Sequence, residues 1–317
     1  MDTFQAMKTF VAVVEAGSFI GATSTTGLSK PAVSRHVAEL EEHLGTRLLQ
    51  RTTRRLSLTS EGQIYFQRCK EVLRAVEEAE AEAGSGSGQA QGRLRIGAPQ
   101  TFGALHLASL WGRFAAENPK VTLDIVLSDR VVDLVEEGYD LVVRIAQLSD
   151  SDIVSRPLAS TRMVVCASPA YLAKHGTPTQ PQELERHEVV SYSHWSSGSV
   201  WSFQGPNGEV SVRTRSRITA NNGDTCRAAA LAHQGIILQP DFLIHEDLRS
   251  GALVEVMRDF RAADLGIFAV YPTRKQLPLK VRRLVDFLVE ALQVPPWQHG
   301  VTEAVTSSAT QRSLGAT

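Results

Sequence analysis

Apolar positions near the N-terminus follow helical spacing and predict three helices. In residues 2–16, apolar side chains recur every three or four positions, which is typical of a helix with one buried face. A short second helix is expected over 20–26, where Gly27 can end it. A third is expected over 29–44, with Ser29 as its N-cap. Two short helices joined by a glycine turn predict a helix-turn-helix.

The third helix combines an apolar face with a face suited to DNA. Val33 and Val37 are expected to point inward. Small, polar or basic residues at its N-terminal end could reach base edges and phosphates in the major groove, namely Ser29, Lys30, Pro31, Ala32, Ser34 and Arg35. A plain three-helix bundle with a polar surface would show the same pattern, so the spacing favours DNA binding and leaves this alternative open.

Residues 47–59 predict a tight β-hairpin directly after that helix, with apolar residues at its base and basic residues at its tip. A wing of this kind reaches the minor groove or the flanking phosphates, where arginine is the suited side chain. The expected contact residues are Arg51, Thr52, Arg54 and Arg55. A solvated charged loop is the alternative, but the position after a recognition-like helix favours DNA. Residues 1–59 are therefore interpreted as a winged helix-turn-helix domain.

Residues 60–83 predict a long amphipathic helix, and 84–92 a flexible linker rich in glycine and serine. Thr59 or Ser60 can cap the helix. Its apolar stripe consists of Cys69, Val72, Leu73, Val76, Ala79 and Ala83. A long helix of this kind needs a packing partner, and the simplest is its copy in a second subunit. Segment 60–92 is therefore interpreted as a dimerisation helix with a linker.

From residue 93 onward, strand-like and helix-like segments alternate, which predicts an α/β domain with largely parallel sheets over 93–297. The strands are expected at 94–98, 121–127, 141–145, 163–167, 189–192, 210–218, 236–238 and 267–271. The helices are expected at 102–116, 131–137, 224–233 and 279–292. A segment of this length can form two lobes with a cleft between them. The small and polar residues 298–317 are expected to be a disordered tail.

The composition restricts the class of protein further. The chain has 317 residues, 43% of them hydrophobic and 21% charged, as in a water-soluble globular protein. No apolar run reaches the roughly 18 residues of a membrane span, and the first residues lack the pattern of a secretory signal. We therefore expect a cytoplasmic protein with no membrane partner. The three cysteines are far apart, which favours neither a disulfide framework nor a zinc site, and no metal or cofactor is expected.

The net charge of −1 would by itself argue against nucleic acid, but the charge is unevenly distributed. Between residues 30 and 55 the sequence has only three glutamates but six basic residues, which are Lys30, Arg35, Arg47, Arg51, Arg54 and Arg55. A local basic face matters more for phosphate binding than the sum over the chain.

An ordered set of motifs in residues 17–62 resembles the LysR-type transcriptional regulators. The motifs are Gly17-Ser18-Phe19, Gly27-Leu28-Ser29-Lys30-Pro31-Ala32-Val33-Ser34-Arg35, Leu44-Gly45-Thr46-Arg47-Leu48-Leu49-Gln50-Arg51 and Leu58-Thr59-Ser60-Glu61-Gly62. Later stretches are similar too, among them Ala98-Pro99, Leu127-Ser128-Asp129-Arg130 and Cys166-Ala167-Ser168-Pro169-Ala170-Tyr171-Leu172. These later stretches resemble the branch that includes the regulators of aromatic-acid efflux and of malate utilisation. The resemblance covers residues 2–294.

The resemblance implies a mainly α-helical winged helix-turn-helix joined by a linker helix to a two-lobed effector domain of the type 2 periplasmic-binding-protein fold. It implies homodimers or dimers of dimers on a double-stranded DNA operator with two half-sites, and it allows RNA polymerase as a further partner. One position departs from the family pattern, because Thr26 stands where a leucine is usual. The segment around it holds three threonines and a serine, which are poor helix formers, and Thr26 would place a hydroxyl in the core.

Ligands between two α/β lobes bind at strand ends and helix N-termini, where free N–H groups favour anions. Two segments fit this position, Pro99, Gln100, Thr101 and Phe102 in the first lobe and Asn221, Asn222 and Asp224 in the second. His194, Trp195 and Trp201 lie in a stretch that could close over an aromatic ligand, and Arg144 could neutralise a carboxylate. We therefore expect a small organic acid as effector, an aromatic one included.

Each of these candidates has a structural alternative. Thr101 and Asn222 could serve only as helix caps, and the two tryptophans could be core residues. Arg144 could instead pair with Asp140 or Asp133.

Two other classes of protein fit less well. An enzyme is disfavoured because the chain has no phosphate-binding loop, nucleophile elbow, dinucleotide fingerprint or His-Glu-x-x-His pair. A solute-binding module is disfavoured by the basic face of residues 30–55 and by the missing signal pattern. DNA binding that weakens steeply with salt would separate a regulator from such a module.

Overall fold

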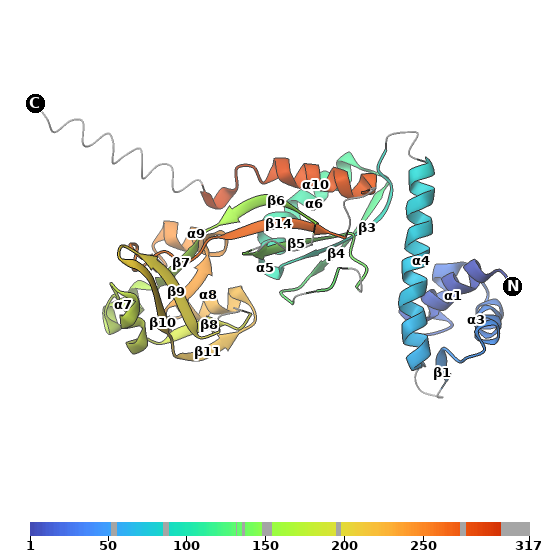
Figure 1. The fold of residues 1–317 in the computed structure, drawn as a ribbon, viewed down its shortest axis with the longest axis horizontal. Helices are drawn as coiled ribbons and strands as arrows, with labels where there is room; N and C mark the ends of the chain where they lie inside the picture. The colour runs from blue at the N-terminus through green and yellow to red at the C-terminus, as the bar shows by residue number, and fades with distance from the viewer. Residues whose placement is uncertain are drawn as a thin grey trace, which may run out of the picture. The chain divides into compact units, whose positions relative to one another are not determined.

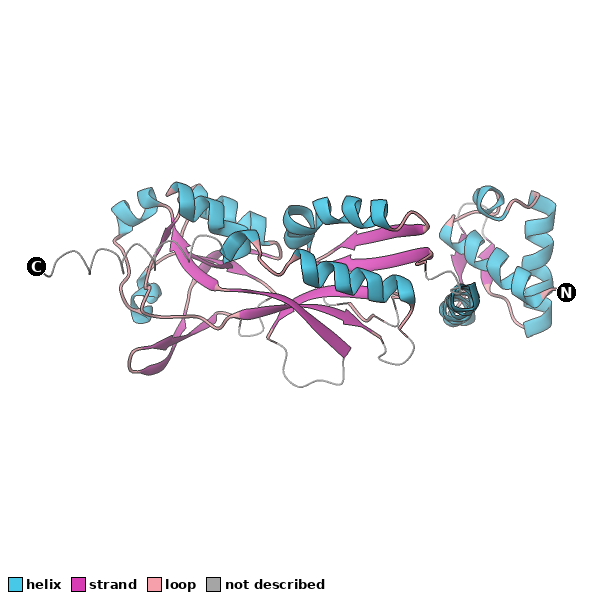
Figure 2. Ribbon diagram, turned by 90° about the horizontal axis from the view of Figure 1, so that it is seen from above, coloured by secondary structure: helices cyan, strands magenta, loops and turns pink. Residues whose placement is uncertain are grey.

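The structure is a computed structural model of the whole chain, and it describes residues 1–51, 56–84, 89–130, 132–134, 137–147, 154–194, 198–272 and 277–298. Its contacts divide the chain into two compact units, one holding Met1–Gly92 and the other Arg93–Leu134 and Tyr139–Thr317. The first unit is mainly helical and the second is α/β (Figures 1 and 2). In the described part, no helix is both long and apolar enough to cross a membrane.

The first unit contains the helices and the hairpin that the sequence predicts. Its elements are α1 (Thr3–Glu15), α2 (Gly21–Thr26), α3 (Lys30–Leu44), β1 (Leu49–Arg51), β2 (Leu56–Leu58) and α4 (Ser60–Gly84). Helix α1 packs on α3 and α4, and Phe10 is fully buried among them. Strands β1 and β2 pair antiparallel, with Leu49 opposite Leu58. This arrangement confirms the winged helix-turn-helix.

Glycines end both helices of the motif as predicted. Gly27 and Gly45 adopt left-handed φ angles of 67° and 65°, which cost little without a Cβ atom. Ser29 occupies the predicted N-cap position of α3, and its side chain makes no capping hydrogen bond there.

The threonine-rich helix α2 satisfies its hydroxyl groups locally. Thr23, Ser24 and Thr26 donate to the carbonyl oxygens of Ile20, Gly21 and Ala22, at 2.7, 2.8 and 2.7 Å. Thr26 is half-buried. The expectation that Thr26 places its hydroxyl in the core is therefore wrong, because Thr26 is only half-buried and its hydroxyl bonds within its own turn.

Replacement of Thr26 by leucine is expected to raise the melting temperature of the first unit by about 2 °C, because leucine favours the helix and buries more apolar surface. The measurement is a thermal melt of both proteins under the same conditions. A fall in melting temperature would mean that the hydroxyl bonds contribute more than the added burial.

Helix α4 does not fit the simple expectation that its apolar stripe faces only a second subunit. Cys69 and Leu73 are 1% and 9% exposed and belong to the core of their own unit. Ile64 and Val72 are 68% and 44% exposed. The apolar residues of α4 therefore fall into two groups. One group is covered by α1 in the core of its own unit, and the other stays exposed.

The first lobe of the second unit is built on a five-stranded sheet of order β4-β3-β5-β14-β6. Its strands are β3 (Gly92–Ala98), β4 (Val121–Leu127), β5 (Leu141–Ala146), β6 (Val154–Thr161) and β14 (Leu265–Tyr271). Helix α5 (Gln100–Phe102) continues through a π-helical turn, Gly103–Leu107, into α6 (Ala108–Glu117). Helix α6 packs with α10 (Leu279–Ala291), as Figure 1 shows, and the rings of Phe114 and Phe287 lie 5.5 Å apart.

The second lobe holds three small sheets. Their strands are β7 (Met163–Ala167), β8 (Val189–Tyr192), β9 (Val200–Gly205), β10 (Gly208–Arg213), β11 (Ser216–Ala220), β12 (Ile237–Pro240) and β13 (Val254–Glu255). Its helices are α7 (Pro169–His175), α8 (Gly223–Leu231) and α9 (Asp241–Ser250), with a 3-10 turn at Pro181–Arg186. A further 3-10 turn, Pro296–Gln298, contacts α9.

Several expectations for this unit need correction. The sheets are mixed, because β14 runs antiparallel to β5 and β6, and β12 and β13 run antiparallel to β7. The strand expected at 210–218 is two strands, β10 and β11. The described residues of 131–137 contain no helix. Most of the expected disordered tail lies outside the described residues.

Candidate functional site

Helix α3 presents one face to the core and the opposite face to solvent. Val33, Val37 and Leu40 are fully buried. At 100° per residue, positions 31, 35 and 38 project to the other side, where these three residues are exposed. Of the residues predicted to contact DNA from this helix, the structure places Ser29, Lys30, Pro31 and Arg35 at the surface and Ala32 and Ser34 half-buried beside them. Arg35 is free to reach a ligand, since its contact with Glu39 is long, at 3.9 Å, and exposed.

A carboxylate on α3 fixes the base of the wing. Glu41 Oε1 accepts hydrogen bonds from the backbone N–H groups of Leu48 and Leu49, at 2.8 and 3.0 Å. Hydrogen bonds to a carboxylate are among the stronger ones in proteins. The sequence reading missed this role because the two donors lie seven and eight residues further along, beyond any local motif.

Thr59 and Gly62 join the other side of the wing to α4. Thr59 Oγ1 donates to the Arg47 carbonyl at 2.7 Å and accepts from the Gly62 N–H at 2.8 Å, and the Thr59 N–H donates to the Leu48 carbonyl at 3.0 Å. The wing therefore has a fixed base. Arg51 lies in β1, while the predicted contacts Thr52, Arg54 and Arg55 lie outside the described residues.

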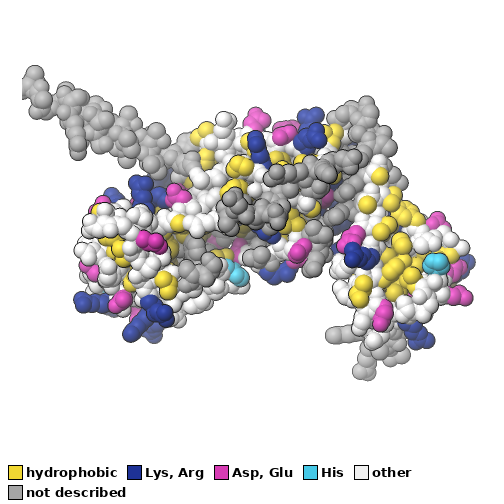
Figure 3. Space-filling view, viewed as in Figure 1, with side chains coloured by type: hydrophobic (Ala, Val, Ile, Leu, Met, Phe, Trp, Pro, Cys, Tyr) yellow, Lys and Arg dark blue, Asp and Glu magenta, His cyan; other side chains and the backbone are white. Residues whose placement is uncertain are grey.

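Helix α4 keeps exposed apolar side chains. Ile64 and Val72 are separated by eight residues, just over two helical turns, so they lie on the same side of the helix. Figure 3 shows apolar atoms gathered over α4 and α1 on the visible face of this unit. Exposed apolar residues that form a patch are typical of a surface that packs against another chain.

A hydrogen bond joins the two lobes of the second unit. Thr101 Oγ1, at the start of α5, donates to Asp224 Oδ2 in the first turn of α8 at 2.5 Å. Thr101 is 7% exposed. The alternative that Thr101 caps its helix is wrong, because Pro99 takes the cap position and makes no side-chain bond. Asn222 does cap α8, since its Oδ1 accepts from the Thr225 N–H at 3.0 Å.

A second carboxylate lies close to this contact. The Gln100 N–H donates to Asp129 Oδ1 at 2.8 Å. The pKa of Tyr192, at the end of β8 in the other lobe, is raised by burial and additionally by the negative charge of Asp129. Asp129 therefore lies near both the start of α5 and the second lobe. The sequence reading missed Asp129, although it occurs in the quoted Leu127–Arg130 motif.

Two buried polar groups near α8 lack hydrogen-bond partners among the described residues. These are Gln239 Nε2 and Ser191 Oγ. Gln239 is 3% exposed, and a methyl group at Gly223 would lie 3.3 Å from its Oε1 atom, so its side chain reaches the start of α8. An unsatisfied buried group is costly in free energy, which makes this pair candidates for ligand contact.

The structure places the remaining effector candidates in different surroundings. Phe102 is fully buried and packs edge-on against Phe242 at 5.1 Å, and Trp201 is a core residue of the second lobe. Arg144 Nη2 donates to the Val132 carbonyl at 2.6 Å, and Asp140 pairs with Lys280 at 3.2 Å. The others are Pro99, which is half-buried, Gln100, Asn221 and His194, which are exposed, and Trp195, which lies outside the described residues.

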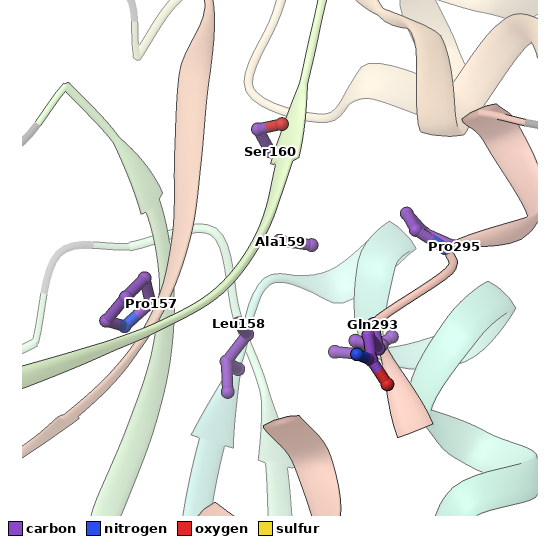
Figure 4. Close-up of a pocket in the computed structure, with 7 residues that line it drawn as sticks. Pro157, Leu158, Ala159, Ser160, Gln293 and Pro295 are labelled. Carbon is purple, nitrogen blue, oxygen red and sulfur yellow. The ribbon is translucent and has the colours of Figure 1, made fainter. Parts of the chain in front are cut away.

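A surface hollow of about 280 Å³ lies away from these residues. Its lining comes from β6 and from the segment after α10, including Leu158, Ser160 and Gln293 (Figure 4). No charged side chain lines it, so it offers little to orient a polar ligand.

The three thiols are buried and lack the character of reactive cysteines. Burial raises the pKa of Cys69 and of Cys226 to about 11, and it raises the pKa of Cys166 as well. No group of three metal-ligating side chains occurs within the described ranges. Cys69 therefore acts in packing, as the sequence indicates.

The comparisons with known proteins agree with this geometry. Residues 4–63 match the bacterial regulatory helix-turn-helix protein, lysR family, and residues 87–293 match the LysR substrate binding domain. The chain is 35% identical over 295 residues to the HTH-type transcriptional regulator YhjC of Escherichia coli, covering 92% of this chain and 99% of the relative. It is 36% identical over 287 residues to the regulator CrgA of Neisseria meningitidis, covering 90% and 96%.

Solved structures give the same result. The structure of CrgA from Neisseria meningitidis has a TM-score of 0.59 at 35% identity, covering 90% of this chain and 98% of that one. The full-length Vibrio cholerae virulence activator AphB has a TM-score of 0.61 at 28% identity, with the same coverage. The chain therefore belongs to the LysR family of DNA-binding transcriptional regulators, with a helix-turn-helix domain followed by a substrate-binding effector domain.

Proposed function

We propose that α3 enters the major groove of an operator and that the wing contacts the minor groove or the neighbouring phosphates. The support is the exposed face of α3 opposite its buried valines, together with the carboxylate of Glu41, which fixes the base of the wing. The proposed contacts are Ser29, Lys30, Pro31, Ala32, Ser34, Arg35, Arg51, Thr52, Arg54 and Arg55.

The protein acts on DNA as a homodimer or a dimer of dimers. Exposed Ile64 and Val72 support a role of α4 in this assembly. Two copies of α3 would then read two half-sites with a two-fold relation. The protein acts in the cytoplasm by binding DNA and an effector, and it does not catalyse a reaction. RNA polymerase is its proposed partner at the promoter. The sequence motifs within 98–130 and 166–172 support membership of the branch of the family that includes the regulators of aromatic-acid efflux and of malate utilisation.

A small effector binds between the lobes at Thr101, Asp224 and Gln239. The observation that carries this proposal is the hydrogen bond from Thr101 to Asp224, because it joins helix starts from two lobes. A ligand that replaces this bond would favour a different lobe arrangement, and the shift in population would change how the dimer holds its half-sites.

Replacement of Thr101 by alanine is expected to abolish the response to the effector, since it removes the donor that joins the lobes. A compound that stabilises the wild-type protein in a thermal screen is first identified, and its effect on operator binding is then compared between the two proteins. Thr179→Ala, at an exposed position before the 3-10 turn of the second lobe, is the matched control and is expected to respond like the wild type. An unchanged response of Thr101→Ala would remove Thr101 from the site.

A further inference from the structure

Two carboxylates of the chain lie beside the helix starts of the two lobes, where an anionic ligand would be expected. Asp129 accepts from the Gln100 N–H at the start of α5, and Asp224 lies in the first turn of α8 and accepts from Thr101. Gln100 and Thr101 are consecutive, so both carboxylates lie within hydrogen-bond distance of one short segment. The N–H groups and helix ends that favour anions are therefore already next to negative charge.

Neither carboxylate is bonded to a described basic side chain. Within the described ranges, Asp129 and Asp224 form no ion pair with an N···O distance of 4.0 Å or less. Arg227, one helical turn after Asp224, is hydrogen-bonded to Asp247 at 2.5 and 2.7 Å, and the charge of Asp224 acts on it only from a longer distance. An acid effector, which the sequence favours, would add a third negative charge beside Asp129 and Asp224.

A buried neutral side chain next to the start of α8 also needs a hydrogen-bond partner. Gln239 Nε2 is a hydrogen-bond donor without a partner in the described part of the chain, on a side chain that is 3% exposed and lies against Gly223. It needs an acceptor, which neither carboxylate supplies. A ligand oxygen in this position would satisfy it.

We infer that the effector carries a positively charged nitrogen group, bound between Asp129 and Asp224, and a neighbouring carbonyl or hydroxyl oxygen, bound by Gln239. The inference rests on the proposed effector site between the lobes. The expected effectors are amines, amidines or guanidines with an adjacent oxygen, such as amino amides and amino alcohols. Charge-assisted hydrogen bonds to both carboxylates would provide the main selectivity against acids.

The test is a thermal-shift screen of the full-length protein with small amines, amidines and guanidines, each accompanied by the carboxylic acid of the same skeleton. A nitrogen cation is expected to raise the melting temperature of the wild type, and its acid counterpart is not. Asp129→Asn and Asp224→Asn are each expected to weaken binding of that cation about tenfold or more, measured by calorimetry. Asp286→Asn, on the exposed face of α10, removes the same charge elsewhere and is expected to bind like the wild type.

Three results would overturn the inference. They are stabilisation by the acids instead of the cations, cation binding that is unchanged in both aspartate variants, and a screen in which no cation stabilises the wild type. Selection of DNA by the same protein sample is measured separately. Failure to select a DNA sequence would contradict the proposed regulator whatever the charge of the ligand, whereas DNA selection combined with binding of acids would contradict the charge assignment alone.

Discussion

Replacement of both Lys30 and Arg35 by alanine is expected to lower operator affinity about 100-fold at physiological salt, because each contact to a base or phosphate contributes on the order of 1–3 kcal/mol. Both side chains are exposed in the first half of α3, Lys30 at its first residue and Arg35 on the side away from Val33 and Val37. Loss of phosphate contacts should also make affinity less dependent on salt, by about one unit of log–log slope per contact. Fluorescence anisotropy with labelled operator across a salt series measures both quantities.

Lys8→Ala is the matched control for this prediction. Lys8 is exposed in the same unit, on α1, and its ammonium group lies over the ring of Phe4 at 4.5 Å. Its removal changes the charge of the unit without touching α3, so operator affinity should stay near the wild-type value. Equal losses in the control and in the double variant would show that only overall charge matters, which contradicts a recognition role for α3.

The second large effect is expected at Gly62, where alanine should destabilise the first unit by about 3 kcal/mol. A Cβ atom at this position would lie 2.0 Å from the Leu48 carbonyl oxygen and 2.8 Å from its carbonyl carbon. These are backbone atoms at the base of the wing, so the clash cannot be relieved by a side-chain rotation. Relief requires α4 to move away from the wing, which would also disturb the hydrogen bonds of Thr59.

Calorimetry of the full-length protein measures this effect. Gly112→Ala provides the comparison, because Gly112 also lies inside a helix, α6, and a Cβ atom there meets nothing within 4 Å. In that open position alanine should leave the stability unchanged or raise it by about 0.5–1 kcal/mol. If Gly62→Ala melts like the wild type, the close packing of α4 on the wing is wrong.

The first unit could be predicted from sequence because its signals are local. The spacing of Val33, Val37 and Leu40 defines one face of α3, and glycines mark the ends of α2 and α3. Such signals depend only on neighbours three or four residues away. The division of the α4 stripe could not be predicted in this way, because it depends on α1 covering Cys69 and Leu73.

The candidate effector site could be predicted only in part, because its contacts join residues that are far apart in the sequence. Thr101 and Asp224 were both named from the sequence, but their bond spans 123 positions along the chain, and no local pattern links them. The positions of Asp129 and Gln239 in the site likewise depend on contacts between residues far apart in the sequence. Trp201 was a candidate for ligand contact because it lies in a Ser/Gly-rich stretch, but strand β9 directs it into the core, which was the alternative. Strand direction was also missed, since alternation alone does not show that β14 returns antiparallel between β5 and β6.

The measurement that tests the central claim most directly is selection of bound fragments from a random DNA pool by the purified full-length protein. At about physiological salt, we expect enrichment of a two-fold-symmetric motif, since two copies of α3 would read equivalent half-sites roughly one helical turn of DNA apart. The enrichment should be lost in the double variant of Lys30 and Arg35 and kept in Lys8→Ala. A folded wild-type protein that enriches no motif, or that enriches the same motif after loss of Lys30 and Arg35, would contradict the account.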